Sequence, residues 1–230
     1  MKTVTNVICL LSVIISLTCS IILASYTSVY AKERDGKDNQ EQQNSIQICC
    51  AWGEQLADGE LTYKITGGNS DIRQAVRNAV GQWDLKIAGL TLQEVKDDSS
   101  STDIYFNFKK DGSSLPGAKT KQGLLTAGLT IFTLNWRGLI EETHVTIAKG
   151  VSGRGFSSDQ IELVAKHETG HALGLGHSNF RASIMSSTIS NRQTGLISDC
   201  EINAVLGVNA WKLVDNYSKP HSAAGSKIGC

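Results

Sequence analysis

The sequence predicts a single α+β domain. Two observations carry this prediction: short segments in which apolar and polar side chains alternate, as in strands, and longer segments with apolar residues at three- and four-residue spacing, as in helices. The 230 residues, with 40% hydrophobic and 19% charged side chains, are ordinary for one globular domain. Because the formal net charge is zero, no electrostatic argument favours nucleic acid, and we expect no nucleic-acid partner.

An export signal is predicted at the N-terminus. Residues 1–31 contain an apolar run from Val7 to Ala24 and a small-residue site that ends at Ala31, the pattern of a signal peptide cleaved after that residue. The length of the apolar run leaves an uncleaved membrane anchor open as the alternative. In both cases we expect a secreted or cell-surface domain that meets the membrane only through this segment. Residues 32–48 are predicted to be a polar linker.

The domain itself is expected to span residues 49–215. Residues 61–66 alternate apolar and polar side chains and precede two glycines, which predicts a half-buried strand. From Ser70 or Asp71 to Gly89, apolar residues recur at helical spacing and predict an amphipathic helix that packs on a sheet. Further strands are predicted at residues 102–108, 124–134 and 143–148.

The second half of the domain is predicted to be mainly helical. A helix is expected to begin at Ser158 or Asp159 and to continue into a histidine-rich segment. Another helix is expected from about Cys200 to Lys212, and residues 216–230 are expected to be a C-terminal tail.

The most informative segment is His167 to His177, which reads HETGHALGLGH. On a helix, His167 and His171 stand one turn apart on the same face, so both imidazoles can reach one ion. Gly174 can take the positive φ that ends the helix, and His177 follows as a third nitrogen ligand. Three histidines leave one position of a tetrahedral zinc open, which is typical of a catalytic site. Glu168 lies beside these ligands.

This motif, followed by Ser183-Ile184-Met185-Ser186, resembles the metzincin zinc metallopeptidases, and among them most closely the matrixins, peptidase family M10. Supporting residue patterns extend over most of residues 49–211. The resemblance implies a zincin-like fold: a twisted mixed β-sheet packed on two long helices, with the zinc helix at the cleft, and a C-terminal helix.

The resemblance also implies a set of site residues and a function. Zinc would be held by His167, His171 and His177, with Glu168 as the general base and Met185 beneath the metal. The implied activity is that of an exported metalloendopeptidase that hydrolyses peptide bonds with a zinc-activated water. We expect a monomer and a protein or peptide substrate that lies extended across the cleft, with the strand at residues 143–148 as its upper rim. The alternative is a catalytically silent surface binding module, against which the retention of Glu168 argues.

Several departures from the matrixin pattern limit what the resemblance implies. Too few residues separate Ala31 from the first predicted strand to form the usual prodomain, and no proline follows the methionine turn. A structural calcium ion is an expectation by analogy, without ligands assigned. His144 and His221 are too few for a second, structural zinc site, so His144 is predicted to be an ordinary strand histidine.

Four cysteines lie outside the predicted leader: Cys49, Cys50, Cys200 and Cys230. In an oxidising compartment this even number predicts two disulfides. The simplest arrangement links the Cys49–Cys50 pair to Cys200 and Cys230, because a bridge between adjacent cysteines is strained. The connectivity stays open at this point, as does the alternative in which Cys49 or Cys50 supplies a thiolate to the zinc.

Overall fold

A mixed five-stranded sheet is the largest element of the protein. The computed structural model describes residues 43–96, 101–115, 126–188, 195–215, 219–220 and 223–230. The strand order is β3-β2-β4-β6-β5, in which β5 is antiparallel to β6 and all other neighbours are parallel. The strands are β2 (Glu60–Ile65), β3 (Thr91–Glu94), β4 (Ile104–Lys109), β5 (Gly128–Leu134) and β6 (Ile140–Ala148).

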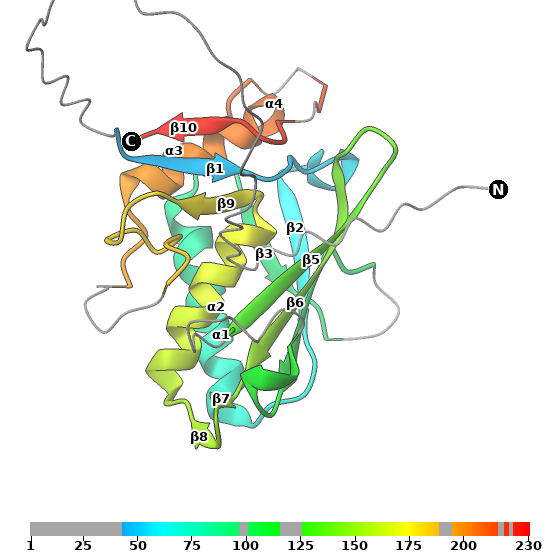
Figure 1. The fold of residues 1–230 in the computed structure, drawn as a ribbon. Helices are drawn as coiled ribbons and strands as arrows, with labels where there is room; N and C mark the ends of the chain where they lie inside the picture. Colours follow the sequence, from blue (N-terminus) through cyan, green and yellow to red (C-terminus); the bar gives the residue numbers. More distant parts are fainter. Residues whose placement is uncertain (1–42, 97–100, 116–125, 189–194, 216–218, 221–222) are drawn as a thin grey trace, which may run out of the picture.

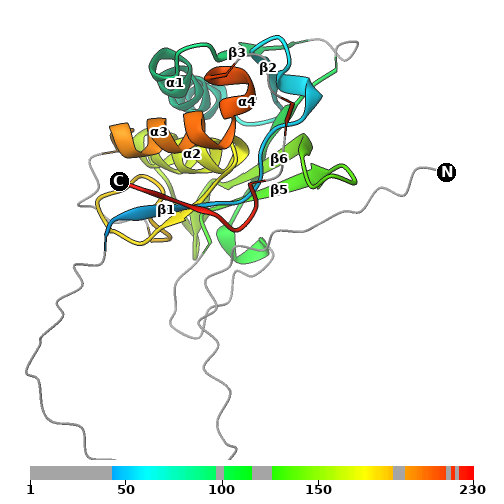
Figure 2. The ribbon, with the colours of Figure 1, turned by 90° about the horizontal axis from the view of Figure 1, so that it is seen from above.

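Two long helices lie side by side against one face of this sheet (Figures 1 and 2). In α1 (Ser70–Lys86) the buried side chains recur at helical spacing, from Ala75 to Trp83, as the sequence predicted. Its N-cap is Asn69, one residue earlier than expected, and the Asn69 side chain accepts a hydrogen bond from the backbone N–H of Ile72. The helix α2 (Ser158–Ala172) packs between α1 and the strands β5 and β6.

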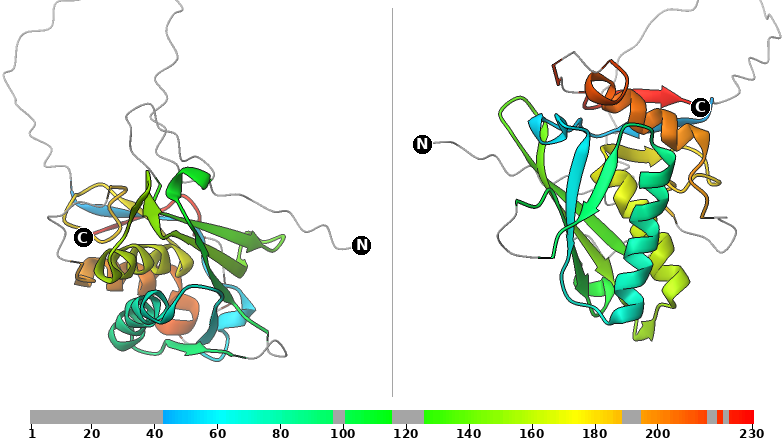
Figure 3. Two further views of the ribbon diagram at one scale, coloured as in Figure 1. Left: turned by 90° about the horizontal axis from the view of Figure 1, so that it is seen from below. Right: turned by 180° about the vertical axis from the view of Figure 1, so that it is seen from behind.

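This arrangement confirms the predicted α+β class and the mixed sheet on two helices. The four predicted strands correspond to β2, β4, β5 and β6, with ends that differ by a few residues. The strand β3 was missed, because only four residues alternate there and the strand depends on its parallel pairing with β2. Figure 3 shows from behind how α1, which connects β2 to β3 along the chain, lies against the sheet.

A second sheet joins three distant parts of the chain at the upper end of α2 (Figure 1). In it β1 (Ser45–Ile48) lies between β10 (Lys227–Gly229) and β9 (Leu175–Ser178) and is antiparallel to both. The prediction of a linker over residues 32–48 is therefore wrong for its last four residues. The prediction of a tail over residues 216–230 is wrong for β10. These strands are too short to show a local pattern, and long-range pairing stabilises them.

The predicted C-terminal helix is divided into two. The helices α3 (Asp199–Val208) and α4 (Ala210–Leu213) are separated at Asn209. The buried Asn209 side chain accepts a hydrogen bond from the backbone of Trp52 and donates one to the carbonyl of Leu173, so it ties these helices to the end of α2. The remaining elements are η1 (Glu54–Leu56), η2 (Gly112–Ser114), β7 (Gly150–Val151) and β8 (Arg154–Gly155).

The cysteines pair differently from the simplest expectation. A disulfide joins Cys200, at the start of α3, to Cys230, directly after β10. Cys49 and Cys50 are bridged to neither of these residues, and their two sulfur atoms lie 2.7 Å apart. The predicted cross-links were wrong because β10 pairs with β1 and brings Cys230 next to Cys200, with 5.0 Å between their Cα atoms. The spacing of the cysteines in the sequence does not reveal this proximity.

The predicted signal segment, residues 1–31, lies outside the described residues. Among the residues that the structure does describe, no helix has the length and apolar character needed to cross a membrane.

Candidate metal centre and active site

The helix α2 carries the first two histidines, and the turn after it delivers the third. Its first residue is Ser158, one of the two predicted starts, and its N-cap Ser157 forms a capping box with Gln160, in which each side chain bonds the other residue's backbone N–H group. Its end is set by Gly174, whose φ is 101° and whose missing Cβ leaves room for the carbonyl oxygen of Cys50. The chain then enters β9, which carries His177.

The three predicted ligands come together in space. The ring centroids of His167 and His171 lie 4.6 Å apart, and His177 lies 5.4 Å from the first and 4.9 Å from the second. One nitrogen from each ring lies within 4.8 Å of the other two. This convergence of imidazole nitrogens suits a zinc ion, for which histidine is a preferred ligand. Neither Cys49 nor Cys50 belongs to the group.

Hydrogen bonds fix which ring nitrogens face the ion. The Nδ1 atom of His167 lies 2.6 Å from the carbonyl oxygen of Ile184, and that of His171 lies 2.8 Å from the carbonyl oxygen of Leu175. A carbonyl oxygen can only accept, so both Nδ1 atoms carry the proton. The lone pairs are then on the Nε2 atoms, and the backbone orients both rings for ligation.

Burial keeps the three imidazoles neutral. It lowers the pKa of His167, and it lowers that of His171 further, with added repulsion from the other two rings. Burial, together with repulsion from His167, lowers the pKa of His177 to about 4. Neutral imidazole is the form that binds a metal, so at neutral pH the site needs no deprotonation.

Glu168 lies in the same buried region without being one of the converging ligands. Its carboxylate is buried, and burial raises its pKa to about 7, an effect that a hydrogen bond from Thr130 opposes. The Thr130 hydroxyl on β5 donates to Glu168 Oε2 at 2.7 Å. A carboxyl group with a pKa near 7 can both accept and return a proton at neutral pH.

Met185 lies beneath the histidine helix. It is fully buried, its carbonyl oxygen accepts a hydrogen bond from Ser178 N, and its N–H donates to Ser183 Oγ. The Met185 thioether occupies the space that a Cβ on Gly170 of α2 would need. Ser183 in turn donates to the buried Glu201 carboxylate of α3 at 2.5 Å, so the methionine segment is held from both sides.

The upper rim of the site is formed by β5 and not, as predicted, by residues 143–148. Those residues belong to β6, which pairs with β4 on one side and β5 on the other. Its backbone groups are therefore occupied. Within the described residues β5 is the last strand of the sheet, and it contacts α2 directly. The prediction was wrong because chain order does not reveal that β5 folds back outside β6.

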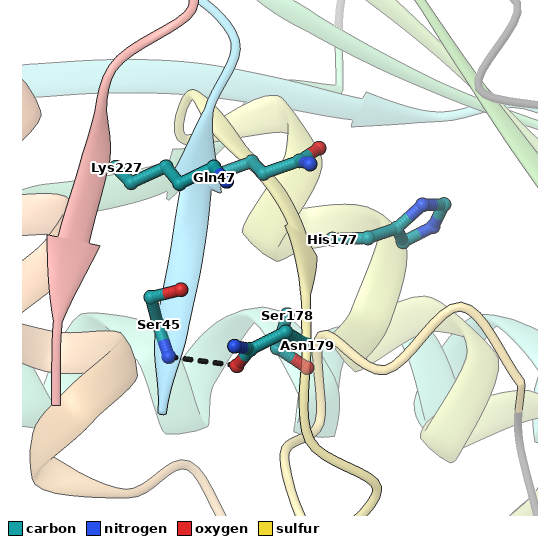
Figure 4. Close-up of a pocket in the computed structure, with 6 residues that line it drawn as sticks. All are labelled: Ser45, Gln47, His177, Ser178, Asn179 and Lys227. Carbon is teal, nitrogen blue, oxygen red and sulfur yellow. Dashed lines mark hydrogen bonds between the residues drawn. The ribbon is translucent and has the colours of Figure 1, made fainter. Parts of the chain in front are cut away.

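A small hollow of about 80 Å³ opens beside His177 on the second sheet (Figure 4). In Figure 4 the Gln47 side chain extends from β1 toward His177, and Lys227 reaches in from β10. Lys227 is the only lining residue with a fixed charge. The hollow is lined by Ser45, Gln47, His177, Ser178, Asn179 and Lys227.

The other metal predictions find no counterpart in the described residues. Across that part of the chain, the histidine triad is the only group of three or more His, Cys, Asp or Glu side chains that converges, and a calcium site gains no support. His144 stacks on Tyr105 and lies 2.7 Å from Glu142 Oε1, which is the setting predicted for a strand histidine. His221 lies outside the described residues.

Two residues that shape the site were missed by sequence reasoning. Thr130 bonds Glu168, and Gly128 leaves the space that the Glu168 side chain fills. Both lie in the predicted strand at residues 124–134, whose two-residue period places them on one face. The available signal was a glycine and a threonine on the inward face of an otherwise apolar strand.

These features define a metallopeptidase of the zincin type. They are a mixed sheet above a helix that carries two histidines, a third histidine after a glycine turn, and a buried glutamate beside the histidines. The family model described as Matrixin, peptidase family M10, matches residues 51–206, more than half of the chain. The chain belongs to the matrixin family, as the resemblance implied. It is a zinc metallopeptidase domain, and protein or peptide is its class of substrate.

Proposed function

We propose that the protein is an exported zinc-dependent endopeptidase. The ion is held by His167, His171 and His177, and Glu168 is the general base. The observation that carries the proposal is the buried Glu168 carboxylate, which lies beside three neutral imidazoles and is held by Thr130. A buried carboxylate that ligates nothing is costly to the fold, which argues for a role in the reaction.

The chemistry divides between the ion and the chain. Zinc, when bound, supplies a Lewis acid that polarises water and the substrate carbonyl. Glu168 takes a proton from the attacking water and delivers it to the leaving amine nitrogen, so its carboxylate is regenerated at the end of the reaction. Met185 packs against Gly170 below the helix α2 and so supports the position of the histidines that this helix carries.

The substrate is proposed to lie extended along β5. This strand borders the site and has a strand neighbour on one side only among the described residues, so its outer edge can pair with substrate backbone. Substrate residues on one side of the cleaved bond then reach the hollow beside His177. A peptide bound along its length in this way is cut internally, which makes the enzyme an endopeptidase.

The proposal includes export, which the N-terminal segment supports, and a monomeric state. Residues 1–31 direct export, and the mature enzyme acts as a monomer outside the cytoplasm, secreted or at the cell surface. N-terminal sequencing of the exported protein is expected to begin at Lys32. If the protein is found in a membrane fraction with residues 1–31 intact, the segment is a membrane anchor and is not cleaved. If the protein is retained in the cytoplasm, the proposal of export is wrong.

Turnover is tested with full-length protein and an unfolded protein substrate. Wild type, Glu168→Ala and a matched surface variant, Glu142→Gln, are each loaded with zinc and their metal content is measured. We expect internal cleavage by wild type and Glu142→Gln, loss of activity in Glu168→Ala and in chelator-treated samples, and recovery after zinc is restored to wild type. If wild type cuts no faster than Glu168→Ala while both hold one zinc, the silent binding module is the correct function.

A further inference from the structure

The face of β5 that meets α2 is shaped around one side chain. Side chains alternate along a strand, so Gly128 and Thr130 point to the same face. Both meet Glu168: Thr130 through its hydroxyl group and Gly128 through the absence of a side chain. We call these two residues the β5 notch.

Thr130 holds one oxygen of the carboxylate. Its Oγ1 lies 2.7 Å from Glu168 Oε2 and 3.3 Å from the Glu168 backbone oxygen. A hydroxyl has one proton to donate, and the shorter contact takes it. Both residues are buried, and a hydrogen bond to a buried carboxylate is stronger than one in water. Oε1 remains as the oxygen that can receive a proton.

Gly128 provides the space for the carboxyl group. A Cβ at this position would overlap Glu168 Oε1 and would lie 2.6 Å from both Cδ and Cγ. No real Cβ approaches other atoms so closely, so any larger residue at position 128 would displace Glu168. Gly128 does not have a positive φ, so backbone freedom does not account for the glycine here.

We propose that the β5 notch positions Glu168 for catalysis: Thr130 holds Oε2, and Gly128 leaves room for Oε1, the oxygen that receives a proton from the reacting water. The inference rests on the proposed function, because it assigns positioning residues to the proposed general base. Since β5 is also the strand along which the substrate is proposed to lie, one element would align both the base and the peptide. A displacement of about 1 Å in such a base is enough to cost a large part of the rate.

The activity test compares four zinc-loaded full-length proteins: wild type, Thr130→Val, Thr130→Ser and Thr91→Val. Valine keeps the shape of threonine but removes the donor, whereas serine keeps the donor. Thr91 is exposed on β3, at the opposite edge of the sheet from β5, and is the matched control. We expect kcat to fall about 10- to 100-fold in Thr130→Val at unchanged KM, the range typical for loss of an orienting partner. Thr130→Ser and Thr91→Val should stay close to wild type.

A purely structural role for Thr130 predicts another result. In that case Thr130→Val would unfold more easily but retain its kcat when folded and zinc-loaded. A kcat of Thr130→Val within about threefold of wild type, or an equal loss in Thr130→Ser, overturns the proposal. A wild-type protein that cuts no substrate overturns the proposed function itself, and that outcome is recognised before any variant is compared.

A second measurement needs no activity. Urea unfolding of zinc-free wild type, Thr130→Val, Glu168→Leu and the double variant, above neutral pH, forms a thermodynamic cycle. Leucine removes both carboxylate oxygens, whereas glutamine would keep an oxygen that accepts from Thr130. We expect the two substitutions to be coupled by about tenfold in the unfolding equilibrium constant, as for a hydrogen bond to a charged group. Additive effects of the two substitutions would show that Thr130 does not hold Glu168 and would overturn the proposal even if the peptidase activity stands.

Discussion

Removal of the Cys200–Cys230 disulfide is expected to destabilise the protein and weaken its metal site together. The change is the double substitution Cys200→Ser and Cys230→Ser. The two cysteines are separated by 30 positions in the sequence. For a loop of that length, chain entropy gives a loss of about 3.5 kcal/mol in the free energy of unfolding.

The effect on the metal follows from the second sheet. Cys230 anchors β10, which pairs with β1, and β1 pairs with the strand that carries His177. When β10 is released, β1 loses one of its two neighbours and His177 loses support. We expect zinc affinity to fall about tenfold, at the lower end of the range for losing an outer-shell partner.

The assay for this variant combines two measurements. Urea unfolding of the zinc-free protein, followed by circular dichroism, gives the free energy of unfolding, and competition with a chelator gives zinc affinity. Cys49→Ser is the control, because it makes the same chemical change outside the bridge. A loss below about 1 kcal/mol, with the wild-type bridge verified by mass spectrometry, would refute the chain-entropy argument. Unchanged zinc affinity would refute the link through β1.

Three further predictions concern buried groups. In zinc-free protein the pKa of Glu168 is raised from 4.5 to about 7, so ionisation of its carboxyl group destabilises the fold as the pH rises. Between pH 4.5 and 7, the free energy of unfolding of Glu168→Gln should therefore rise by about 3 kcal/mol relative to that of wild type, measured by urea unfolding at a series of pH values. A difference between the two proteins that stays constant with pH would contradict this. Gly170→Ala should lower the free energy of unfolding by about 2 kcal/mol, because the added Cβ would overlap the Met185 thioether. Gly81 of α1 has open space around it, so Gly81→Ala should raise this free energy by about 0.5 kcal/mol. Changes of the same sign in the two variants would refute the packing argument. Glu201→Ala should lower the free energy of unfolding by about 3 kcal/mol, and with it the melting temperature, because it removes the buried carboxylate to which the hydroxyls of Ser183 and Ser198 donate. An unchanged melting temperature in a calorimetric scan would be evidence against that network.

The metal centre was the most predictable part of the molecule. His167, His171 and His177 converge because helix periodicity and one glycine turn suffice to place them, and both are local properties of eleven residues. The helix α1 was equally predictable, since its buried residues recur at helical spacing from Ala75 to Trp83 within a helix of 17 residues. For such elements the local pattern and the tertiary structure agree.

The support around the metal centre was not predictable in the same way. Thr130 meets Glu168 across 38 positions of sequence, and Lys227 pairs with Gln47 across most of the chain. These contacts depend on the order of strands in two sheets, which residue spacing does not encode. The same cause explains why β6 was taken for the rim and why Cys230 was assigned the wrong partner.

The buried indole groups give this protein an internal optical reporter. Trp83 donates from Nε1 to the carbonyl oxygen of Lys166, and Trp52 donates to that of Ala172, so the two indoles bracket the segment with the first two zinc ligands. Of the four tryptophans, Trp136 alone is largely exposed, at 91%. In a Trp136→Phe background all indole emission would arise from the core, and its wavelength would follow the environment of the zinc helix without any attached dye.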